Sequence, residues 1–467
     1  MKSLIYVIFL SAIVALGGFL FGYDTAVISG TTEDVKAFYQ LTDFQQGWYV
    51  GCAILGCIIG VLMAGRLSDA FGRKPLLMTS AVLFALSSAG CAVYSGFYQL
   101  ALYRILGGVG IGVVSIIAPL YISEISIPKY RGRLVACYQL AITVGILASY
   151  LSNTAVLKWS QSVQYESGIL KMAINDQVWR GMLGMETFPA VLFLLVLFLI
   201  PESPRWQVVK QHDGKALRTF GKIYSPVKAQ KEIDEIRDVI SQETKSDWRL
   251  LLKPGFRIAL IVGIAIAMLG QFMGINAVIY YGPKFLLEAG LEKTASLDFQ
   301  IWVGLVNVVS TILAMTVIDR IGRKKLIYIG VSGMLIFLIG IGLFFYGAAA
   351  GLAISFWVLF GLILAYVFSC AISICAVIFV LLSEMYPVKV RGSAMSVAGF
   401  SLWAGAFLIS QLTPWLTTRL SASGVFWLFG VMCIPYLLIT YFLVPETTGK
   451  SLEDIEREWM ERGKRRT

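Results

Sequence analysis

Two charged residues lie inside stretches of sequence that are otherwise apolar. Asp24 falls in a long run that begins at Leu4, and Arg104 falls in the stretch 98–121. A charge inside a membrane-spanning helix is costly, and such residues usually have a function. At the helical rise per residue, Asp24 lies about 9 Å and Arg104 about 10 Å from the same outer end of their helices. The two side chains are therefore able to pair.

An ion pair at that depth has a specific chemical use. Burial disfavours the charged carboxylate, while a neighbouring arginine favours it. If a rearrangement moves Arg104 away, Asp24 must take up a proton, which ties proton binding to a conformational cycle. The alternative interpretation is a static ion pair that fixes the packing of the helices.

Carboxylates and basic residues also recur at the ends of apolar stretches, in the same order in both halves of the chain. The matched sets are Asp69, Arg73, Glu124, Arg131 and Glu202 in the first half, and Asp319, Arg323, Glu384, Arg391 and Glu446 in the second. Such an order indicates a duplicated unit. We expect these residues to gate the protein by forming and releasing bonds between helices. The alternative is that the basic residues only hold loops on one side.

The elements that must position these side chains are membrane-spanning helices. Hydrophobic residues make up 57% of the chain and charged residues 14%, far below the charge of a soluble domain. The apolar blocks suit helices of roughly 20 residues and lack the alternation of barrel strands. We predict twelve spans at 5–29, 45–66, 75–95, 98–121, 133–156, 179–200, 257–287, 298–319, 325–347, 352–382, 392–417 and 424–444.

The distribution of basic residues predicts the orientation. With both termini in the cytoplasm, the loops on the outer side carry few basic residues, namely Lys36, Lys158, Lys171, Lys284, Lys293 and Arg419. Basic residues gather on the cytoplasmic side of membrane proteins. The net charge of +11 therefore needs no nucleic-acid partner.

The predicted spans and the polar segments between them divide the chain into four parts of an all-α membrane protein. These are an N-terminal six-helix bundle at 1–200, a cytoplasmic helical linker at 201–255, a C-terminal six-helix bundle at 256–446, and a cytoplasmic tail with a short helix at 447–467. Parallel six-helix repeats are a known transporter plan, with the substrate site between the halves. The seven cysteines all fall in predicted spans and are interpreted as packing residues, with no metal site.

Several motifs together identify a resemblance. Gly65-Arg66-Leu67-Ser68-Asp69 with Arg73-Lys74, Pro201-Glu202-Ser203-Pro204-Arg205 and Pro445-Glu446-Thr447 resemble the sugar porters of the major facilitator superfamily. The resemblance covers nearly the whole chain and is strongest to bacterial proton-coupled pentose and hexose symporters, and beyond them to facilitative glucose transporters. It implies that Asp24 is the proton acceptor and Arg104 its partner, because facilitators of the family tend to carry a neutral residue at that Asp.

The resemblance also implies a sugar site. A sugar presents hydroxyl groups and an apolar ring face, so it needs amides and aromatic rings. The matching positions are Gln139, Gln271, Asn276, Asn307, Trp403, Phe21 and Tyr280. The alternative for each amide is a hydrogen bond between helices. Gln271 and Asn276 lie about 140° apart around a straight helix, so both face one cavity only if that helix bends.

Three positions depart from the family pattern. Gly270 replaces a glutamine, Cys375 to Phe379 replace a Gly-Pro-x-x-Trp motif, and Leu402 replaces a polar residue. We expect a roomier and less polar cavity in which Phe379 still stacks on a ring. A deoxy sugar, a polyol, weak affinity or another ligand would fit these changes.

We therefore predict a proton-coupled monosaccharide symporter that works by alternating access in a cell membrane, the inner membrane of a bacterium. The proton is the coupling ion and no cofactor is expected. We expect the protein to lie in the lipid bilayer and to function as a monomer. The alternatives are a sugar or polyol uniporter, which Asp24 and Arg104 disfavour, and a sugar sensor, which the short tail disfavours. No motif indicates an enzyme, because the glycines at 107–112 lie within a span and indicate close helix packing.

Overall fold

The computed structural model describes residues 2–93, 96–242, 254–386 and 391–446, together with Ile455 and Trp459. Within these ranges the regular elements are helices and no strand occurs, which confirms the all-α prediction. Of the predicted tail helix, only Ile455 and Trp459 lie among the described residues, and both are helical and buried.

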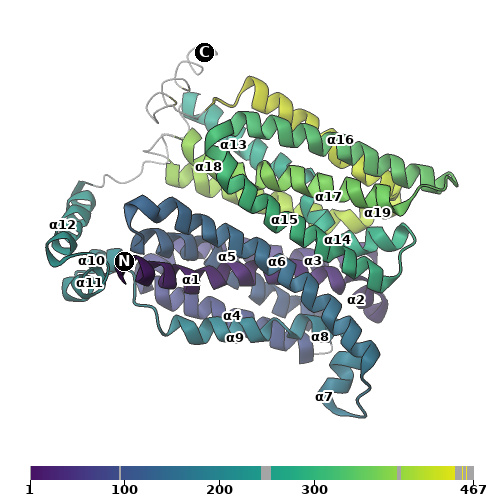
Figure 1. Ribbon diagram of the computed structural model, residues 1–467, viewed down its shortest axis with the longest axis horizontal. Helices are drawn as coiled ribbons and strands as arrows, with labels where there is room; N and C mark the ends of the chain where they lie inside the picture. Colours follow the sequence, from purple (N-terminus) through teal and green to yellow (C-terminus); the bar gives the residue numbers. More distant parts are fainter. Residues whose placement is uncertain are drawn as a thin grey trace. The chain divides into compact units, whose positions relative to one another are not determined.

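The first half of the chain forms a bundle of apolar helices. They are α1 (Lys2–Val27), which continues into η1 (Ile28–Gly30), α3 (Asp43–Phe71), α4 (Arg73–Val93), α5 (Phe97–Ile125), α6 (Arg131–Ser162), α8 (Val178–Gly184) and α9 (Thr187–Leu197). Short elements connect them: α2 (Thr32–Tyr39), η2 (Pro128–Tyr130), α7 (Gly168–Leu170) and η3 (Lys171–Asp176). Figure 1 shows α1, α4, α5, α6 and α9 running side by side, with α7 at one end.

Glycines set the spacing of this bundle. A Cβ atom on Gly22 would lie 1.9 Å from the carbonyl oxygen of Ile142, and one on Gly145 would lie 2.0 Å from that of Phe19, so α1 and α6 touch backbone to backbone. Gly108 and Gly112 act in the same way between α5 and α3, since a Cβ on Gly108 would lie 1.9 Å from the carbonyl oxygen of Ala53, while Gly107 and Gly110 face α4. The prediction of close helix packing there is confirmed.

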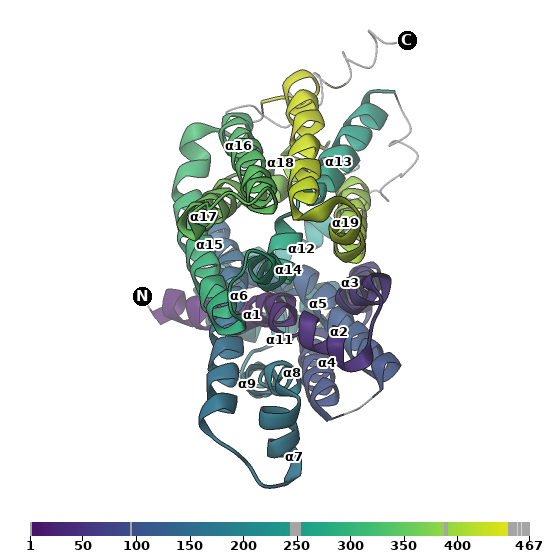
Figure 2. The same cartoon turned by 90° about the vertical axis from the view of Figure 1, so that its right-hand side faces the viewer.

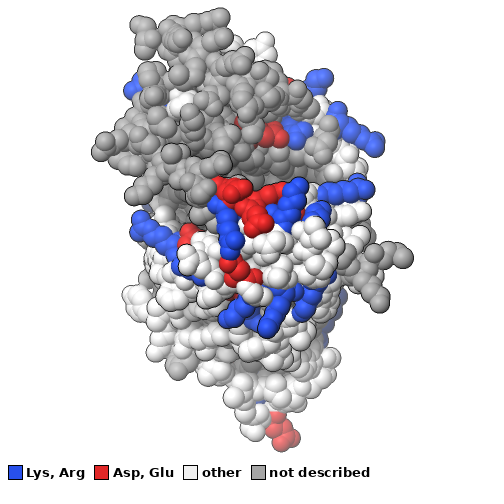
Figure 3. Space-filling view, turned by 90° about the vertical axis from the view of Figure 1, so that its left-hand side faces the viewer, with Lys and Arg blue, Asp and Glu red and all other residues white. Residues whose placement is uncertain are grey.

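Three helices of the polar segment pack together at one end of the first bundle. They are α10 (Pro204–Val209), α11 (Asp213–Phe220) and α12 (Pro226–Gln242), and they lie beside the N-terminal end of α1 in Figure 1. Their shared core consists of Val208, Ala216, Phe220, Ala229 and Ile233. Lys, Arg, Asp and Glu side chains gather on the face of the molecule at this end, as Figure 3 shows.

The second half contains α13 (Pro254–Phe272), α14 (Ile275–Glu288), α15 (Lys293–Ile321), α16 (Arg323–Ala349), α17 (Phe356–Ile372), α18 (Ile374–Met385) and α19 (Arg391–Phe442). Figure 2 looks along these helices, and α16 packs against both α17 and α19. By contacts the chain divides into two compact units, residues 1–35 with 52–244 and residues 36–51 with 245–467. The first turns of α3 thus group with the second half.

Eleven helical segments among the described residues are long and apolar enough to cross a membrane. One of them, Gly392–Phe442, has 51 residues, which would make a straight helix about 77 Å long, far more than a bilayer needs. Ser421 has non-helical backbone angles (φ 61°, ψ 170°) inside it. The segment therefore comprises two crossings, as the predicted spans 392–417 and 424–444 require.

Two further spans are broken in the middle. Gly274, with φ +88°, separates α13 from α14, which confirms the predicted bend between Gln271 and Asn276. Ser373 (φ −110°, ψ −90°) separates α17 from α18. No break was predicted within the span 352–382, and neither glycine nor proline occurs near Ser373.

Candidate functional site

Asp24 on α1 and Arg104 on α5 meet in the interior of the first unit. Arg104 Nη1 donates a hydrogen bond to Asp24 Oδ1 at 2.5 Å, and each side chain is only 3% exposed. The close approach of α5 is possible because Gly107, one turn after Arg104, has no side chain where Ser87 and Asp24 lie nearby. The structure thus brings the predicted pair together in a dry interior, where an unpaired charge is expensive.

A third ionisable group, which the sequence analysis missed, lies beside this pair. Glu186 sits in the turn between α8 and α9 and is 2% exposed. The charges of Asp24 and Arg104 both act on its carboxyl group. Among the residues that the structure describes, Glu186 Oε1 and Asp24 Oδ2 have no hydrogen-bond partner. The signal was present in the sequence, because Glu186 is an acidic residue inside the predicted span 179–200.

This triad has one cation for two carboxyl groups. A low-dielectric interior disfavours an uncompensated carboxylate, so the charge balance of the triad depends on where Arg104 lies. The arrangement can therefore exchange a proton whenever the position of Arg104 changes. Phe21 on α1 and Gln139 on α6, predicted for the sugar, are both partly exposed.

The second unit holds the other predicted sugar residues. Asn276 Nδ2 donates a hydrogen bond to Gln271 Oε1 at 2.8 Å across the break at Gly274, so the break turns both amides toward each other. Asn307 on α15 and Trp403 on α19 are partly exposed. Tyr280 is buried at 7% exposure, whereas Phe379 on α18 is 52% exposed.

The surroundings of Gly270 leave room for a small side chain. A Cβ atom there would meet only Ile374 at 3.6 Å and Tyr436 at 3.8 Å, both ordinary contacts. Tyr436 is fully buried, and its hydroxyl group has no hydrogen-bond partner within the described ranges. It is a second polar residue that the sequence analysis did not select, because one tyrosine in an apolar helix gives no distinctive signal.

The predicted gating residues form a compact network at the end of the first bundle. Arg73 binds Glu124 through two hydrogen bonds, from Nε at 3.1 Å and from Nη2 at 3.0 Å. Arg73 also contacts Asp69 at 3.3 Å and the carbonyl of Ser68 at 3.0 Å. Arg73 is 8% exposed, so this is a largely buried link between α4 and α5.

Glu202, also predicted to gate, binds the start of α4. Its carboxylate accepts hydrogen bonds from the backbone N–H groups of Arg73 at 2.9 Å, Lys74 at 3.2 Å and Ser203 at 2.7 Å. It therefore caps the N-terminus of α4. Gly72, with φ +103°, allows the contact, since a Cβ there would lie 2.3 Å from Glu202 Oε2. Burial raises the pKa of this carboxyl despite those three bonds.

The second half repeats this arrangement in a looser form. Arg323 Nη2 donates to Glu384 Oε1 at 3.0 Å, with side chains 13% and 26% exposed. Lys324 Nζ donates to the carbonyls of Tyr441 and Val444, as Lys74 does to those of Phe198 and Ile200. The duplication inferred from the sequence is thus confirmed at the level of single bonds. Glu446 is partly exposed, while the side chains of Asp319 and Arg391 lie outside the described part of the structure.

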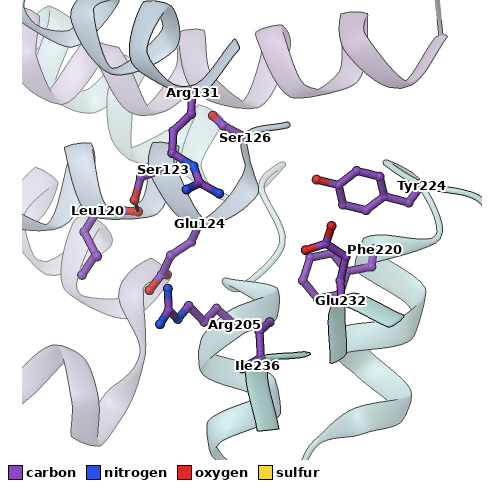
Figure 4. A pocket seen from close by; sticks show the side chains of 10 residues that line it. All are labelled: Leu120, Ser123, Glu124, Ser126, Arg131, Arg205, Phe220, Tyr224, Glu232 and Ile236. Atoms are coloured by element: carbon purple, nitrogen blue, oxygen red, sulfur yellow. Dashed lines mark hydrogen bonds between the residues drawn. The ribbon is translucent and has the colours of Figure 1, made fainter. Parts of the chain in front are cut away.

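A small cavity adjoins the first network. Its volume is about 140 Å³, and α5, α6 and the three helices α10 to α12 line it. Figure 4 shows Arg131 and Arg205 near Glu124, with Tyr224 and Glu232 on the opposite wall. Arg131, predicted to gate, makes no ion pair within 4.0 Å among the described residues, since Glu124 already binds Arg73. Burial and the charge of Glu232 raise the pKa of Tyr224.

Comparison with known proteins gives concordant results. The family model described as "Sugar (and other) transporter" matches residues 10–459. The arabinose-proton symporter of Bacillus subtilis is 37% identical over 98% of this chain and 96% of its own length. The D-xylose-proton symporter of Escherichia coli K12 is 34% identical over 97% of this chain and 96% of its own length. The inward open structure of the xylose transporter XylE from E. coli has a TM-score of 0.82 at 33% identity, covering 97% of this chain and 100% of that one.

Proposed function

The chain belongs to the family of sugar and other transporters, and on that premise we propose that it carries a monosaccharide across the membrane together with a proton, by alternating access. It is a multi-pass membrane protein and a transporter rather than an enzyme. The observation that carries the proton coupling is the buried Asp24–Arg104 ion pair with Glu186 beside it. The names of the relatives as arabinose-, xylose- and galactose-proton symporters support the same assignment.

The proton step follows from the charges of this triad. While Arg104 faces Asp24, the carboxylate is compensated and needs no proton. When the helices shift and Arg104 turns away, Asp24 is left in an apolar interior beside Glu186, and protonation becomes the favourable way to remove its charge. Return of Arg104 then expels the proton. Glu186 strengthens this exchange because its carboxyl group adds to the negative charge that the single arginine must balance.

The sugar site follows from the amides. The side chains of Gln271 and Asn276 are hydrogen-bonded to each other. When that bond opens, each amide offers a donor and an acceptor to sugar hydroxyls. Gln139, Asn307, Trp403, Phe21 and Tyr280 complete the proposed site, and Phe379, more than half exposed, supplies a face for the ring. The space beside Gly270 favours a pentose, hexose or related polyol bound with fewer hydrogen bonds than the family pattern provides.

The gating residues act by holding helix ends. Arg73 and Glu124 tie α4 to α5, Arg323 and Glu384 tie α16 to α18, and Glu202 fixes the start of α4. We assign Asp69, Arg131, Asp319, Arg391 and Glu446 to the same function from their matched positions in the two halves. Release of these bonds would let the helix ends move apart during the transport cycle.

The distribution of basic residues supports a topology in which both termini lie in the cytoplasm. We propose that the protein lies in the inner membrane of a bacterium and that a monomer is sufficient for transport. No cofactor enters the proposal. A C-terminal reporter that is active only in the cytoplasm tests the orientation: activity is expected, and a silent reporter on a normally inserted protein contradicts it.

Uptake into proteoliposomes tests the function. With an inward proton gradient, labelled pentoses, hexoses and polyols are screened for accumulation above the outside concentration. We expect accumulation by the wild type, and only equilibration by Asp24→Asn. A wild type that never exceeds equilibration would make the protein a facilitator, and a protein that moves no sugar or polyol would show that Gly270, Phe379 and Leu402 have changed the ligand.

A further inference from the structure

Two cysteines face each other across the break between α17 and α18. Cys370 lies in the last turn of α17, and Cys375 lies in the first turn of α18. Their Sγ atoms are 3.7 Å apart. Both thiols are free, and Cys370 is buried whereas Cys375 is partly exposed. A disulfide has a bond length of about 2.0 Å, so a modest closing motion would join them.

The backbone between the two cysteines is suited to such a motion. Ser373 departs from helical angles, and its side chain donates to the carbonyl of Ser369 rather than to a neighbouring helix. A straight helix would place residues five apart on different faces. The break is therefore what brings the two thiols together, and their separation reports its geometry.

Cys375 also has the features of a reactive thiol. It stands at the N-terminal end of a twelve-residue helix, where the helix dipole favours a thiolate. It is accessible in part, unlike Cys52, Cys57 and Cys91, which are buried within the first unit. A thiolate with a second thiol in contact is the arrangement in which oxidation proceeds to a disulfide.

The pair is connected to the break that carries Gln271 and Asn276. Tyr366, one turn before Cys370, donates a hydrogen bond to the carbonyl of Met273 at 2.7 Å. Ile374, beside Cys375, is the nearest neighbour of the Cβ position of Gly270. The residues around the α17–α18 break are therefore in direct contact with the segment 270–276.

We propose that Cys370 and Cys375 form a dithiol modification site, which two-electron oxidants of the peroxide class or trivalent arsenicals close, and that closing it stops transport. In the peroxide reaction the Cys375 thiolate attacks one oxygen, giving a sulfenic acid and one water. The Cys370 thiol then displaces the second oxygen as water, and the S–S bond forms. The thiols lose two electrons and two protons, and the peroxide is reduced to two waters.

The test uses a variant that keeps only these two cysteines, with Cys52, Cys57, Cys91, Cys137 and Cys433 replaced by serine or alanine. After hydrogen peroxide, mass spectrometry of the intact protein should show the loss of two hydrogens, and both thiols should escape alkylation. Phenylarsine oxide should protect both thiols with one arsenic atom per protein. A protein with two alkylatable thiols after either treatment would overturn the proposal. This readout is chemical, so it is independent of the transport that the functional consequence assumes.

The consequence is measured by sugar uptake before and after treatment. We expect loss of uptake in the two-cysteine variant and its recovery with a dithiol reductant. In the two-cysteine variant, Cys370→Ser or Cys375→Ser should each make sugar uptake resistant to the oxidant and the arsenical. In the full-length wild type, Cys433→Ser should leave uptake sensitive to both. If the disulfide forms and uptake is unchanged, or if either single-thiol variant is inhibited as strongly, the coupling of this pair to transport is wrong.

Discussion

At the scale of single residues, the central feature is one guanidinium shared by two buried carboxyl groups. Asp24 and Glu186 are both buried in the first unit, where Arg104 is paired with Asp24 and its charge also acts on Glu186. In a buried, low-dielectric interior, a carboxylate that no cation compensates is costly. In the proposed mechanism, the position of Arg104 therefore decides whether a proton is bound.

Glu186→Gln tests that view of the triad. Removing a neighbouring negative charge makes protonation of Asp24 less favourable, so the alkaline limit of gradient-driven uptake should move toward acid by about 1 pH unit. The pH profile of uptake measures this shift, with the exposed Glu292→Gln as the matched control. An unchanged profile for Glu186→Gln would mean that Glu186 does not act on the proton site.

Two glycines four residues apart should respond to alanine in opposite ways. Gly270 is helical, and a Cβ atom there would make only ordinary contacts with Ile374 and Tyr436, so Gly270→Ala should stabilise the protein by up to about 1 kcal/mol. Gly274 has φ +88°, and a Cβ there would lie 2.2 Å from Phe429, so Gly274→Ala should cost about 1–3 kcal/mol. Thermal unfolding in detergent compares them, and equal effects would contradict the geometry of the break.

At the scale of the elements, the two halves use the same bonds with different degrees of burial. The Arg73–Glu124 pair is 9% and 3% exposed, while the Arg323–Glu384 pair is 13% and 26% exposed. Leaving a buried partner uncompensated costs far more than leaving an exposed one. The repeat is therefore symmetric in its contacts and asymmetric in its energetics.

Matched arginine substitutions measure this asymmetry. Arg73→Ala should lower the free energy of unfolding by about 3–5 kcal/mol, because Glu124 stays buried. Arg323→Ala should lower it by about 1 kcal/mol, because water reaches Glu384 more easily. Thermal stability of the two variants under one condition makes the comparison. A larger loss for Arg323→Ala would show that burial does not set the strength of these links.

Glu202 should make stability depend on pH. Burial raises the pKa of its carboxyl, so the folded protein holds that proton more strongly than the unfolded chain does. By linkage, its contribution to the unfolding free energy is full at low pH and is lost as pH rises through the raised pKa. The difference in stability between wild type and Glu202→Gln should therefore fall as pH rises from the ordinary carboxyl range. A difference that grows with pH would contradict burial as the dominant cause.

At the scale of the whole molecule, the sequence was sufficient for the architecture. Apolar blocks of the right length predicted the spans, and matched motifs predicted the repeat. Both were predictable because a segment that crosses lipid must be apolar and cytoplasmic loops are rich in basic residues. The break at Gly274 was also predictable, since glycine marked it. The break between the spans 392–417 and 424–444 was predicted as well, and Ser421 lies in it. The break at Ser373 was not predicted, because neither glycine nor proline marks it.

The candidate site was predictable in part for the same reason. Asp24 and Arg104 stand out as charges in apolar stretches, and the structure joins them. Glu186 carries the same signal, yet only the fold shows that it reaches Asp24. Tyr436 carries none, because a tyrosine in a span is ordinary until its hydroxyl group is found without a partner.

The most direct test of the central claim is proton movement driven by sugar. Proteoliposomes with an internal pH indicator and no imposed gradient receive an outside pulse of a transported monosaccharide. Internal acidification is predicted for the wild type and none for Asp24→Asn, which should still exchange labelled sugar against unlabelled sugar. Sugar entry without acidification in the wild type, or acidification that persists in Asp24→Asn, would contradict proton coupling through Asp24.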